Sequence, residues 1–407
     1  MRTSWASENL RCRSAYGLAA SLTVSVSQVK RGEVLIVGAG IGGLSASVAL
    51  RGEGFGVTIL EIQPDLHSSV YGVGIIQPVN ALRALDAIGC ADECLRQGYA
   101  SKGWARLLDA SGNLLHEIPG ATIPGFPCMN GITRPKLHKI LTDRAIDSGV
   151  TIEYGSTISD LRDEGDHVKV TCGDGSRRRA DLVVGADGVR SVVRRFVLDA
   201  GLEPRYNGQS AFRVNIPREP EIDQIVLQAG PTGMAGFVPI GQDLAYLFLN
   251  VPWDRSLRPS PEELLAILQG KLAPFGGLTG RIRDTYIDDP AAIVFRPEEY
   301  LIAPAPWHRG RVVLLGDAVH SVTPHLGQGA AQAIEDGVVL AAELGVSGPA
   351  DADVADAFTR YAARRYERCK FIVEASVQIG DWEMHPSPDA DQAGLTQRVM
   401  ETMALPL

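Results

Sequence analysis

The sequence of 407 residues is longer than one ordinary domain and fits two, each with enough interior for a hydrophobic core. Hydrophobic residues make up 45% of the chain and charged residues 21%, which is typical of a globular protein. The formal net charge of -9 argues against a nucleic-acid binder, because proteins that bind phosphate backbones normally present a basic surface. Small-molecule chemistry is therefore the expected class of function.

The cysteines and the N-terminal stretch give few signals of their own. The six cysteines have neither the paired spacing of a metal site nor the density of a disulfide scaffold, so we expect reduced thiols in a cytoplasmic protein. Cys90 and Cys94 lie one helical turn apart, and we interpret them as small apolar side chains on a helix. Polar residues break the apolar stretch 16–29, which is shorter than the about 20 apolar residues of a membrane span. Residues 1–30 are predicted to be an extension of unknown role.

The first predicted elements form a strand–helix–strand unit. Residues 34–37 are a short apolar run that suits a strand covered on both faces. A glycine turn follows, and residues 44–50 carry Ala and Leu at helical spacing. Residues 57–61 are a second apolar strand that ends in a carboxylate. This order predicts the beginning of a parallel sheet.

The rest of the chain alternates between short strands and helices. From residue 151 to residue 181 short strands alternate with turns, and a mostly antiparallel pattern continues from about residue 205 to residue 300. A helical pattern over residues 262–272 interrupts it. Residues 311–315 then return to an apolar strand, which a glycine-rich loop and a long alanine-rich helix follow.

This order predicts an α/β fold in which one domain is inserted into another. The first is a Rossmann-like dinucleotide-binding domain, the second a mostly antiparallel β-sheet domain that binds substrate, and the third part a helical segment. The predicted boundaries are 31–200 and 301–345 for the first domain, 201–300 for the inserted domain and 346–407 for the C-terminal helices.

The glycine turn carries a dinucleotide-binding pattern. Gly38, Gly40 and Gly43 stand at the spacing G-x-G-x-x-G between the first strand and its helix, with Ile41 opening that helix. The first glycine permits the tight turn, the second lets the backbone approach a pyrophosphate, and the third lets helix and strand pack closely. Glu61 ends the second strand, where a carboxylate accepts hydrogen bonds from the adenosine ribose. The pattern predicts a bound dinucleotide without separating NAD from FAD.

A later motif favours FAD. The strand over residues 311–315 ends in Gly316-Asp317, and a loop of small residues then leads through Gly327, Gln328 and Gly329 into a helix. The Asp317 carboxylate can hold ribityl hydroxyls, and the helix N-terminus can stabilise the negative charge that reduction places near flavin N1 and C2. A glycine-rich connection with a buried aspartate as its cap is the alternative interpretation.

A third strand ends in a similar turn. Residues 182–184 are apolar and run into Gly-Ala-Asp187-Gly, after which a basic helix begins. This segment offers the Asp187 carboxylate and several cations beside the cofactor cleft. Such a group suits the passage of a negatively charged nicotinamide cofactor.

Taken together, the three segments resemble the class A flavoprotein monooxygenases, the family of para-hydroxybenzoate hydroxylase and salicylate hydroxylase. The resemblance extends from residue 34 to about residue 376 and includes Arg134, which is similar to a family arginine that contacts FAD. It implies that NADH or NADPH delivers hydride to FAD, and that O2 adds at flavin C4a to give a hydroperoxide that hydroxylates a small aromatic or heteroaromatic ring. It implies no metal, and a monomer or homodimer with no nucleic-acid partner.

The resemblance also supplies candidate catalytic residues. Pro324 and the loop after it are expected at the edge of the isoalloxazine ring, where oxygen reacts. His325 is a candidate acid or base, whereas His320 lies inside the cofactor motif and is expected to have a structural hydrogen-bonding role. Arg213 and Tyr246 are candidate substrate contacts. A related flavoenzyme, such as an epoxidase or a reductase, and a flavin-binding sensor without turnover stay open as alternatives.

Overall fold

The computed structural model describes residues 31–66, 68, 73–198, 201–347 and 351–407. The extension predicted over residues 1–30, with the apolar stretch 16–29, therefore lies outside the described residues. Among the helices that are described, none is long and apolar enough to cross a membrane.

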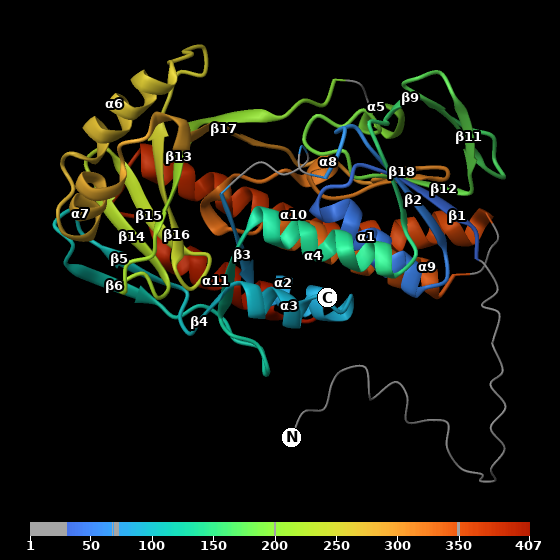
Figure 1. The fold of residues 1–407 in the computed structure, drawn as a ribbon. Coiled ribbons are helices and arrows are strands. Elements are labelled where there is room, and N and C mark those ends of the chain that lie inside the picture. The colour runs from blue at the N-terminus through green and yellow to red at the C-terminus, as the bar shows by residue number, and fades with distance from the viewer. Residues whose placement is uncertain (1–30, 67, 69–72, 199–200, 348–350) are drawn as a thin grey trace, which may run out of the picture. The chain divides into compact units, whose positions relative to one another are not determined.

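A six-stranded sheet forms the dinucleotide-binding part of the fold (Figure 1). In spatial order its strands are β18 (His308–Arg309), β19 (Val312–Leu314), β12 (Leu182–Gly185), β1 (Glu33–Val37), β2 (Gly56–Glu61) and β8 (Thr151–Tyr154). All neighbouring pairs are parallel except β18 and β19. Ile36, Ile59 and Val183 are fully buried, as expected for a parallel sheet that is covered on both faces. The predicted α/β fold with a parallel sheet is confirmed.

Three helices pack closely around this sheet: α1 (Ile41–Gly52), α4 (Arg134–Asp147) and α9 (Gly329–Gly345). The contact between α1 and α9 is tight at Gly337, because a Cβ atom there would lie 2.7 Å from the Ala46 backbone nitrogen. The chain runs from β1 through α1 to β2 on one side, while β12 lies on the other side of β1. A crevice opens where the connections diverge in this way, at the carboxyl ends of the strands.

A second, seven-stranded sheet stands beside the first (Figure 1). In spatial order its strands are β17 (Val294–Tyr300), β13 (Arg205–Pro217), β16 (Leu244–Pro252), β15 (Gly233–Pro239), β14 (Ile225–Gly230), β5 (Ala105–Leu108) and β6 (Leu114–Ile118). Its neighbours are antiparallel except β14 and β5. Two of the strands therefore come from residues 105–118, far from the other five in sequence.

Two helices cover one face of this sheet, namely α6 (Pro261–Leu272) and α7 (Gly277–Tyr286). The start of α6 follows from its sequence, since Ser260 and Glu263 form a reciprocal capping box and Pro261 occupies the first helical position. The helix predicted over residues 262–272 is thus confirmed, whereas α7 was not predicted. Its helix-disfavouring Gly277, Thr279 and Gly280 hide it from a propensity argument.

The C-terminal helices connect the two sheets. Helix α10 (Asp351–Met384) packs against α9 and also contacts β13 and β15, and α11 (Gln392–Ala404) packs against α10 (Figure 1). Apolar residues of both helices, among them Ile379, Val399 and Met403, share a buried cluster with Trp104 and Tyr246. The face of the seven-stranded sheet opposite α6 and α7 is therefore covered by the end of the chain.

The remaining elements are short or belong to small sheets. They are the sheet β3 (Gly74–Pro78), β7 (Met129–Thr133) and β4 (Tyr99–Ser101); the sheet β11 (Arg177–Ala180), β10 (Val168–Cys172) and β9 (Ile158–Asp163); and α2 (Val79–Ala87), α3 (Ala91–Gln97), α5 (Arg194–Val197), η2 (Pro290–Ala292), α8 (Asp317–His320) and η3 (Pro324–Leu326).

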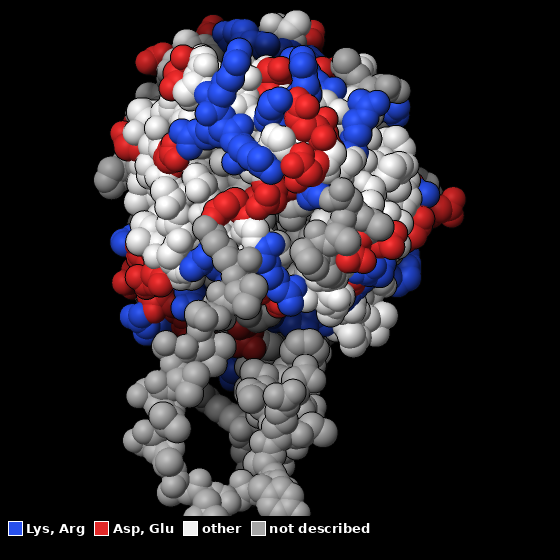
Figure 2. All heavy atoms as spheres, turned by 90° about the vertical axis from the view of Figure 1, so that its right-hand side faces the viewer, with Lys and Arg blue, Asp and Glu red and all other residues white. Residues whose placement is uncertain are grey.

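Basic and acidic side chains intermingle on the face drawn in Figure 2. Ion pairs such as Arg179–Asp166 and Lys169–Glu164, on the sheet of β9 to β11, join charges of opposite sign in this way.

Candidate active site

The turns at the carboxyl ends of β1, β12 and β19 surround a cavity of about 320 Å³. Residues from the first glycine turn, β3, the start of α4 and the start of α9 complete its wall. The cavity thus lies at the crevice where strand order predicts a dinucleotide. Of the predicted cofactor residues, those in its lining are Gly40, Ile41, Arg134, Asp317, Gly327, Gln328 and Gly329.

The first glycine turn has the geometry of a phosphate cradle. Gly38 has φ of +103°, and a Cβ there would lie 2.5 Å from the Ala186 carbonyl oxygen of the β12 turn. A Cβ on Gly43 would lie 2.0 Å from the Gly38 carbonyl oxygen. At Gly40, in contrast, a Cβ would meet nothing within 4 Å. Two glycines therefore allow close backbone packing, while Gly40 leaves open space in front of the α1 N-terminus, which suits a pyrophosphate.

Glu61 holds the far side of this turn. One of its carboxylate oxygens accepts a hydrogen bond from the Ala39 amide at 2.7 Å, and the other accepts one from the Gln63 amide at 2.9 Å. The side chain is buried at the end of β2. Each carboxylate oxygen has a further lone pair, so Glu61 can still accept a ribose hydroxyl there.

The motif after β19 supplies the other wall of the cavity. Gly316 adopts φ of +61°, and its amide donates to the Asp336 carboxylate at 2.8 Å, which fixes the turn before Asp317. Asp317 itself is exposed at the cavity. Gly327, with φ of +62°, and Gln328 lead into the N-terminus of α9, so the positive end of a 17-residue helix faces the cavity.

Asp187 has a different place from the other predicted cofactor residues. Its carboxylate accepts hydrogen bonds from the amides of Val192 and Val193 and from the Ser191 hydroxyl, and its neighbours Ala186 and Gly188 line the cavity instead. Among the cations that follow, Arg194 is buried and donates to backbone carbonyls, and Arg190 pairs with Glu299. These side chains stabilise the turn. The sequence pattern alone did not distinguish this structural role from a role in cofactor binding.

A second, smaller cavity of about 90 Å³ adjoins the first. It lies between the seven-stranded sheet and helices α10 and α11, and most of its wall is apolar. The apolar part includes Trp104, Leu107, Ile118, Ile225, Leu227, Met234, Phe248, Leu326 and Ile379. Both cavities are lined by Ile76, Arg213, Tyr246 and Pro324, so three of the four predicted catalytic residues lie at the junction between them.

The two polar residues of this junction have distinct surroundings. Tyr246 is 7% exposed, and burial raises the pKa of its phenol to about 12, although Arg213 opposes that shift. Within the part of the chain that the structure describes, no residue accepts a hydrogen bond from the Arg213 guanidinium. The junction therefore presents a neutral phenol and a cation with free donor capacity.

The fourth predicted catalytic residue, His325, lines the second cavity within a buried polar cluster. Its Nε2 atom donates to the Gln209 side-chain oxygen at 3.1 Å and lies 3.6 Å from a Glu298 oxygen and 3.5 Å from a Glu383 oxygen. Burial alone would lower the pKa of His325, but the two carboxylates outweigh burial and raise it. The two acids therefore favour the protonated form of His325 at the edge of the cavity.

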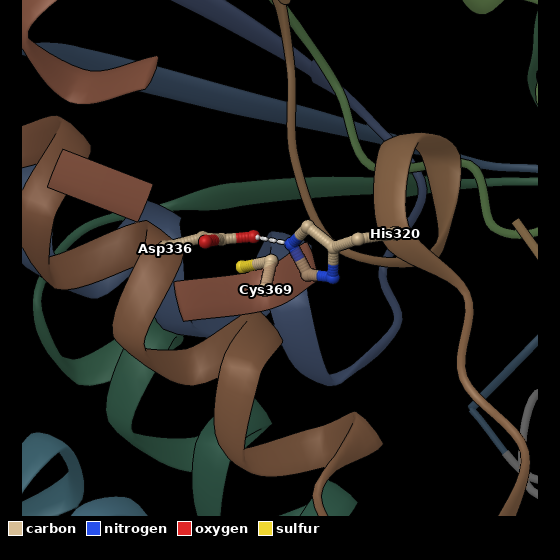
Figure 3. Close-up of side chains that lie close together, drawn as sticks. All are labelled: His320, Asp336 and Cys369. Carbon is tan, nitrogen blue, oxygen red and sulfur yellow. Dashed lines mark hydrogen bonds and ion pairs between the residues drawn. The ribbon is translucent and has the colours of Figure 1, made fainter. Parts of the chain in front are cut away.

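A separate buried cluster stands behind the Gly316–Asp317 turn. Figure 3 shows His320 of α8, Asp336 of α9 and Cys369 of α10 converging, and the atoms that they could offer to a metal lie within 4.8 Å of one another. Arg365 Nε donates to Asp336 at 2.7 Å, and Arg365 Nη2 lies 3.5 Å from the Cys369 sulfur. Asp336 already pairs with both His320 and the Arg365 cation, so the cluster fits a hydrogen-bonded ion network.

This network joins the cofactor motif to the C-terminal helix. His320 Nε2 and Asp336 Oδ2 are 2.5 Å apart, and the fully buried Arg365 also donates to Glu335 at 2.7 Å. Burial alone would lower the pKa of His320, but Asp336 raises it well above its ordinary value. The expected structural role of His320 agrees with this position, since it does not line either cavity.

Comparisons with known proteins decide the family. A family model described as an FAD binding domain matches residues 31–266 and 302–376. This chain belongs to that family. The aurachin C monooxygenase/isomerase of Stigmatella aurantiaca is 33% identical over 86% of this chain and 90% of its own. The 2-heptyl-3-hydroxy-4(1H)-quinolone synthase of Pseudomonas aeruginosa is 32% identical over the same shares.

Solved structures agree with the sequence relatives. The crystal structure of HpxO from Klebsiella pneumoniae, complexed with FAD and uric acid, matches with a TM-score of 0.77 at 25% identity. The match covers 91% of this chain and 92% of HpxO. The chain is therefore an FAD-dependent monooxygenase of the class A group, and FAD is its cofactor. The resemblance seen in the sequence is confirmed.

Several residues of the second cavity were not predicted. Trp104 and Leu107 come from a stretch without a motif, and Asn250 and Glu383 are single polar residues on an otherwise apolar strand face and helix face. A polar residue among apolar ones at strand or helix spacing was the available signal. Only the folded arrangement brings these distant segments together.

Proposed function

We propose that the chain is an NAD(P)H-dependent FAD monooxygenase that hydroxylates a small heteroaromatic compound. The observation that carries the proposal is the junction of the two cavities at Ile76, Arg213, Tyr246 and Pro324. A planar ring in the apolar second cavity would meet the ring end of a dinucleotide in the first. The family assignment supports FAD as that dinucleotide.

FAD would lie in the first cavity, along the turns that surround it. Gly38, Gly40, Ile41 and Gly43 with the α1 N-terminus would hold the pyrophosphate, and Glu61 the adenosine ribose. The remaining proposed contacts are Arg134, Asp317, Gly327, Gln328 and Gly329, which line the opposite wall. Asp187 would act indirectly, by holding the turn that carries Ala186 and Gly188.

Bound FAD supplies the transfer of electrons from NAD(P)H and the activation of O2. The tasks of the chain are to orient the substrate ring, to exclude water and to stabilise charge. Because burial raises the pKa of Tyr246 to about 12, its phenol stays protonated at neutral pH and can donate a hydrogen bond. Arg213 brings positive charge to the same junction, and the α9 N-terminus offers a second site for developing negative charge.

The relatives and the cavity wall both support a heteroaromatic substrate. The names and titles of two relatives include a heptyl-substituted quinolone and uric acid. The apolar wall of the second cavity suits the faces of such rings and an apolar substituent. We further expect a cytoplasmic location, because the five cysteines that the structure describes are buried free thiols, and a monomer or homodimer.

The test uses purified holoprotein and a panel of quinolones, purines, hydroxypyridines and phenols. We expect a yellow protein whose NAD(P)H oxidation accelerates when a heteroaromatic compound binds, with hydroxylated product exceeding hydrogen peroxide. Flavin that NAD(P)H never reduces, with or without the panel, would contradict the proposal and favour a flavin-binding sensor. Acceleration that yields only an epoxide or a saturated product would favour a related flavoenzyme.

A further inference from the structure

The second cavity has a polar side that the apolar wall and the flavin junction do not explain. It is formed by Asn250 of β16, His325 of η3, Glu383 of α10 and the start of α11. Tyr246, Phe248 and Asn250 alternate along β16, so they share one face of the strand. Tyr246 and Asn250 are four residues apart, or about 13 Å along the strand, and Arg213 of β13 pairs with Phe248 between them.

The side chains of this polar group are almost fully buried. Asn250 is 3% exposed, and the Glu383 side chain is 7% exposed. Glu383 Oε2 accepts hydrogen bonds from Asn250 Nδ2 at 3.2 Å and from Gln209 Nε2 at 3.1 Å. These contacts fix the orientation of the Asn250 amide, with its nitrogen toward Glu383.

The group is short of hydrogen-bond donors. Asn250 Oδ1 is buried and has no hydrogen-bond partner in the part of the chain that the structure describes. The same holds for Glu298 Oε1, which belongs to the acid behind His325. Glu383 Oε1 has one long contact, with Gln392 Nε2 at 3.4 Å. A buried acceptor without a donor is unfavourable, so a ligand that brings a donor to it would bind more tightly.

The charges point in the same direction. His325 faces two carboxylates, Glu298 and Glu383, which favour its protonated form. Arg213, the other cation, lines the same cavity opposite Phe248, at the junction with the flavin cavity. A carboxylate placed beside Asn250 would meet the Glu383 carboxylate, a like charge in a buried region. A neutral N–H or O–H group would bring no like charge to that place.

We propose that Asn250 and Glu383 form an acceptor subsite that receives an N–H or O–H donor of an uncharged heteroaromatic substrate and rejects aromatic carboxylates. This inference rests on the proposed function and specifies its substrate class. Lactam-type rings and amino-substituted rings carry such donors, whereas N-methylated rings do not. His325 and Glu298 lie behind the subsite, where His325 is placed between the carboxylates of Glu298 and Glu383.

The experiment measures the binding of three probes to the oxidised holoenzyme through changes in the flavin absorbance spectrum. The probes are 4(1H)-quinolone, its 1-methyl derivative and quinoline-4-carboxylate. We expect the wild type to bind the N–H quinolone about 10-fold more tightly than either other probe, the size expected for one hydrogen bond to a buried or charged acceptor.

Two variants test the subsite independently. Asn250→Leu removes the free acceptor, and Glu383→Gln removes the negative charge while keeping the side-chain shape. In both, we expect the preference for N–H over N-methyl to fall to about 3-fold or less, and Glu383→Gln should also improve binding of the carboxylate. Glu374→Gln, the same change at an exposed position of α10, is the matched control and should keep the wild-type preference.

Three results would overturn the inference: tighter binding of the carboxylate by the wild type, no binding of the N–H quinolone, or a preference that survives in both variants with full flavin content. The proposed function is scored separately, by stimulated NAD(P)H oxidation. A carboxylate that binds best and stimulates turnover would sink the subsite and leave the monooxygenase proposal standing. If the three probes bind as predicted but NAD(P)H never reduces the flavin, the subsite would stand and the monooxygenase proposal would fail.

Discussion

Gly40 is a position where a side chain meets no protein atom, yet faces the cavity that fits the pyrophosphate. We expect Gly40→Val to fold normally and to bind FAD at least about 10-fold more weakly, because the side chain takes the space of the phosphates. Flavin absorbance per protein and the melting temperature measure the two effects. Gly52→Val, at the other end of α1 and also free of contacts, should keep its flavin; normal flavin content in Gly40→Val would refute the cradle.

Asp317 is the carboxylate that we place on the ribityl chain. Asp317→Ala is expected to yield colourless or weakly yellow protein, since the side chain is exposed at the cavity and holds no described fold contact of its own. Asp317→Asn keeps part of the hydrogen-bonding capacity and should retain more flavin. Full flavin retention in Asp317→Ala would count against this placement.

Sequence reasoning can predict such positions wherever a local motif records the requirement. The roles of Gly38 and Gly43 depend on backbone contacts within one turn and its neighbour, and glycine spacing encodes them. The role of Asn250 depends on Glu383, a residue 133 positions away in the chain. No local pattern encodes such a pair, because burial among apolar neighbours and charge balance are properties of the assembled fold.

Helices α9 and α10 are joined by buried charges more than by surface contacts. Asp336→Asn removes the shared partner of His320 and Arg365, leaving two buried cations with less compensation. We expect a loss of about 3–5 kcal/mol in the free energy of unfolding, measured by urea titration. Asp143→Asn, in the exposed i,i+4 pair with Lys139, should cost about 0.5 kcal/mol or less. Equal effects of the two changes would contradict a buried clamp.

The same clamp has a predictable dependence on pH. Burial alone would raise the pKa of Asp336, but His320 and Arg365 lower it from 3.8 to about 2. Because the pKa is lower in the folded state, the stability that Asp336 contributes is present above about pH 4 and is lost as the pH falls toward 2. The deficit of Asp336→Asn relative to the wild type should therefore shrink in urea titrations below about pH 4. A deficit that stays constant would indicate lost packing instead of lost charge pairing.

Local signals predicted strands β1, β2, β12 and β19 of the parallel sheet and helix α6, and missed α7, β5 and β6. The first group carries apolar runs, a capping box or glycine turns, whereas α7 begins with glycines and β6 is exposed over most of its length. An exposed edge strand has no apolar alternation to reveal it. Its pairing partner, β5, is joined to β14 across more than a hundred residues of chain.

At the scale of the whole molecule, helix α11 forms one wall of the second cavity, where we propose that substrate binds. Ala393 lines that cavity, so Ala393→Phe should fill part of it without touching the FAD cradle. We expect normal flavin content, substrate affinity about 10-fold weaker and a larger share of electrons lost as hydrogen peroxide, because the ring can no longer sit at the junction. Glu401→Phe, on an exposed position of the same helix, is the control for added bulk. Unchanged coupling in Ala393→Phe would show that substrate sits elsewhere.

The pairing of β5 with β14 has a consequence for how specificity can be moved between relatives. A graft of only residues 201–300 from another family member would bring a new β13 to β17, yet Trp104, Leu107 and Ile118 would remain those of the host. The second cavity of such a hybrid would be lined partly by donor residues and partly by host residues, so its shape would match neither parent. Transplanting selectivity therefore requires residues 104–118 and the C-terminal helices α10 and α11 to travel with the larger insert.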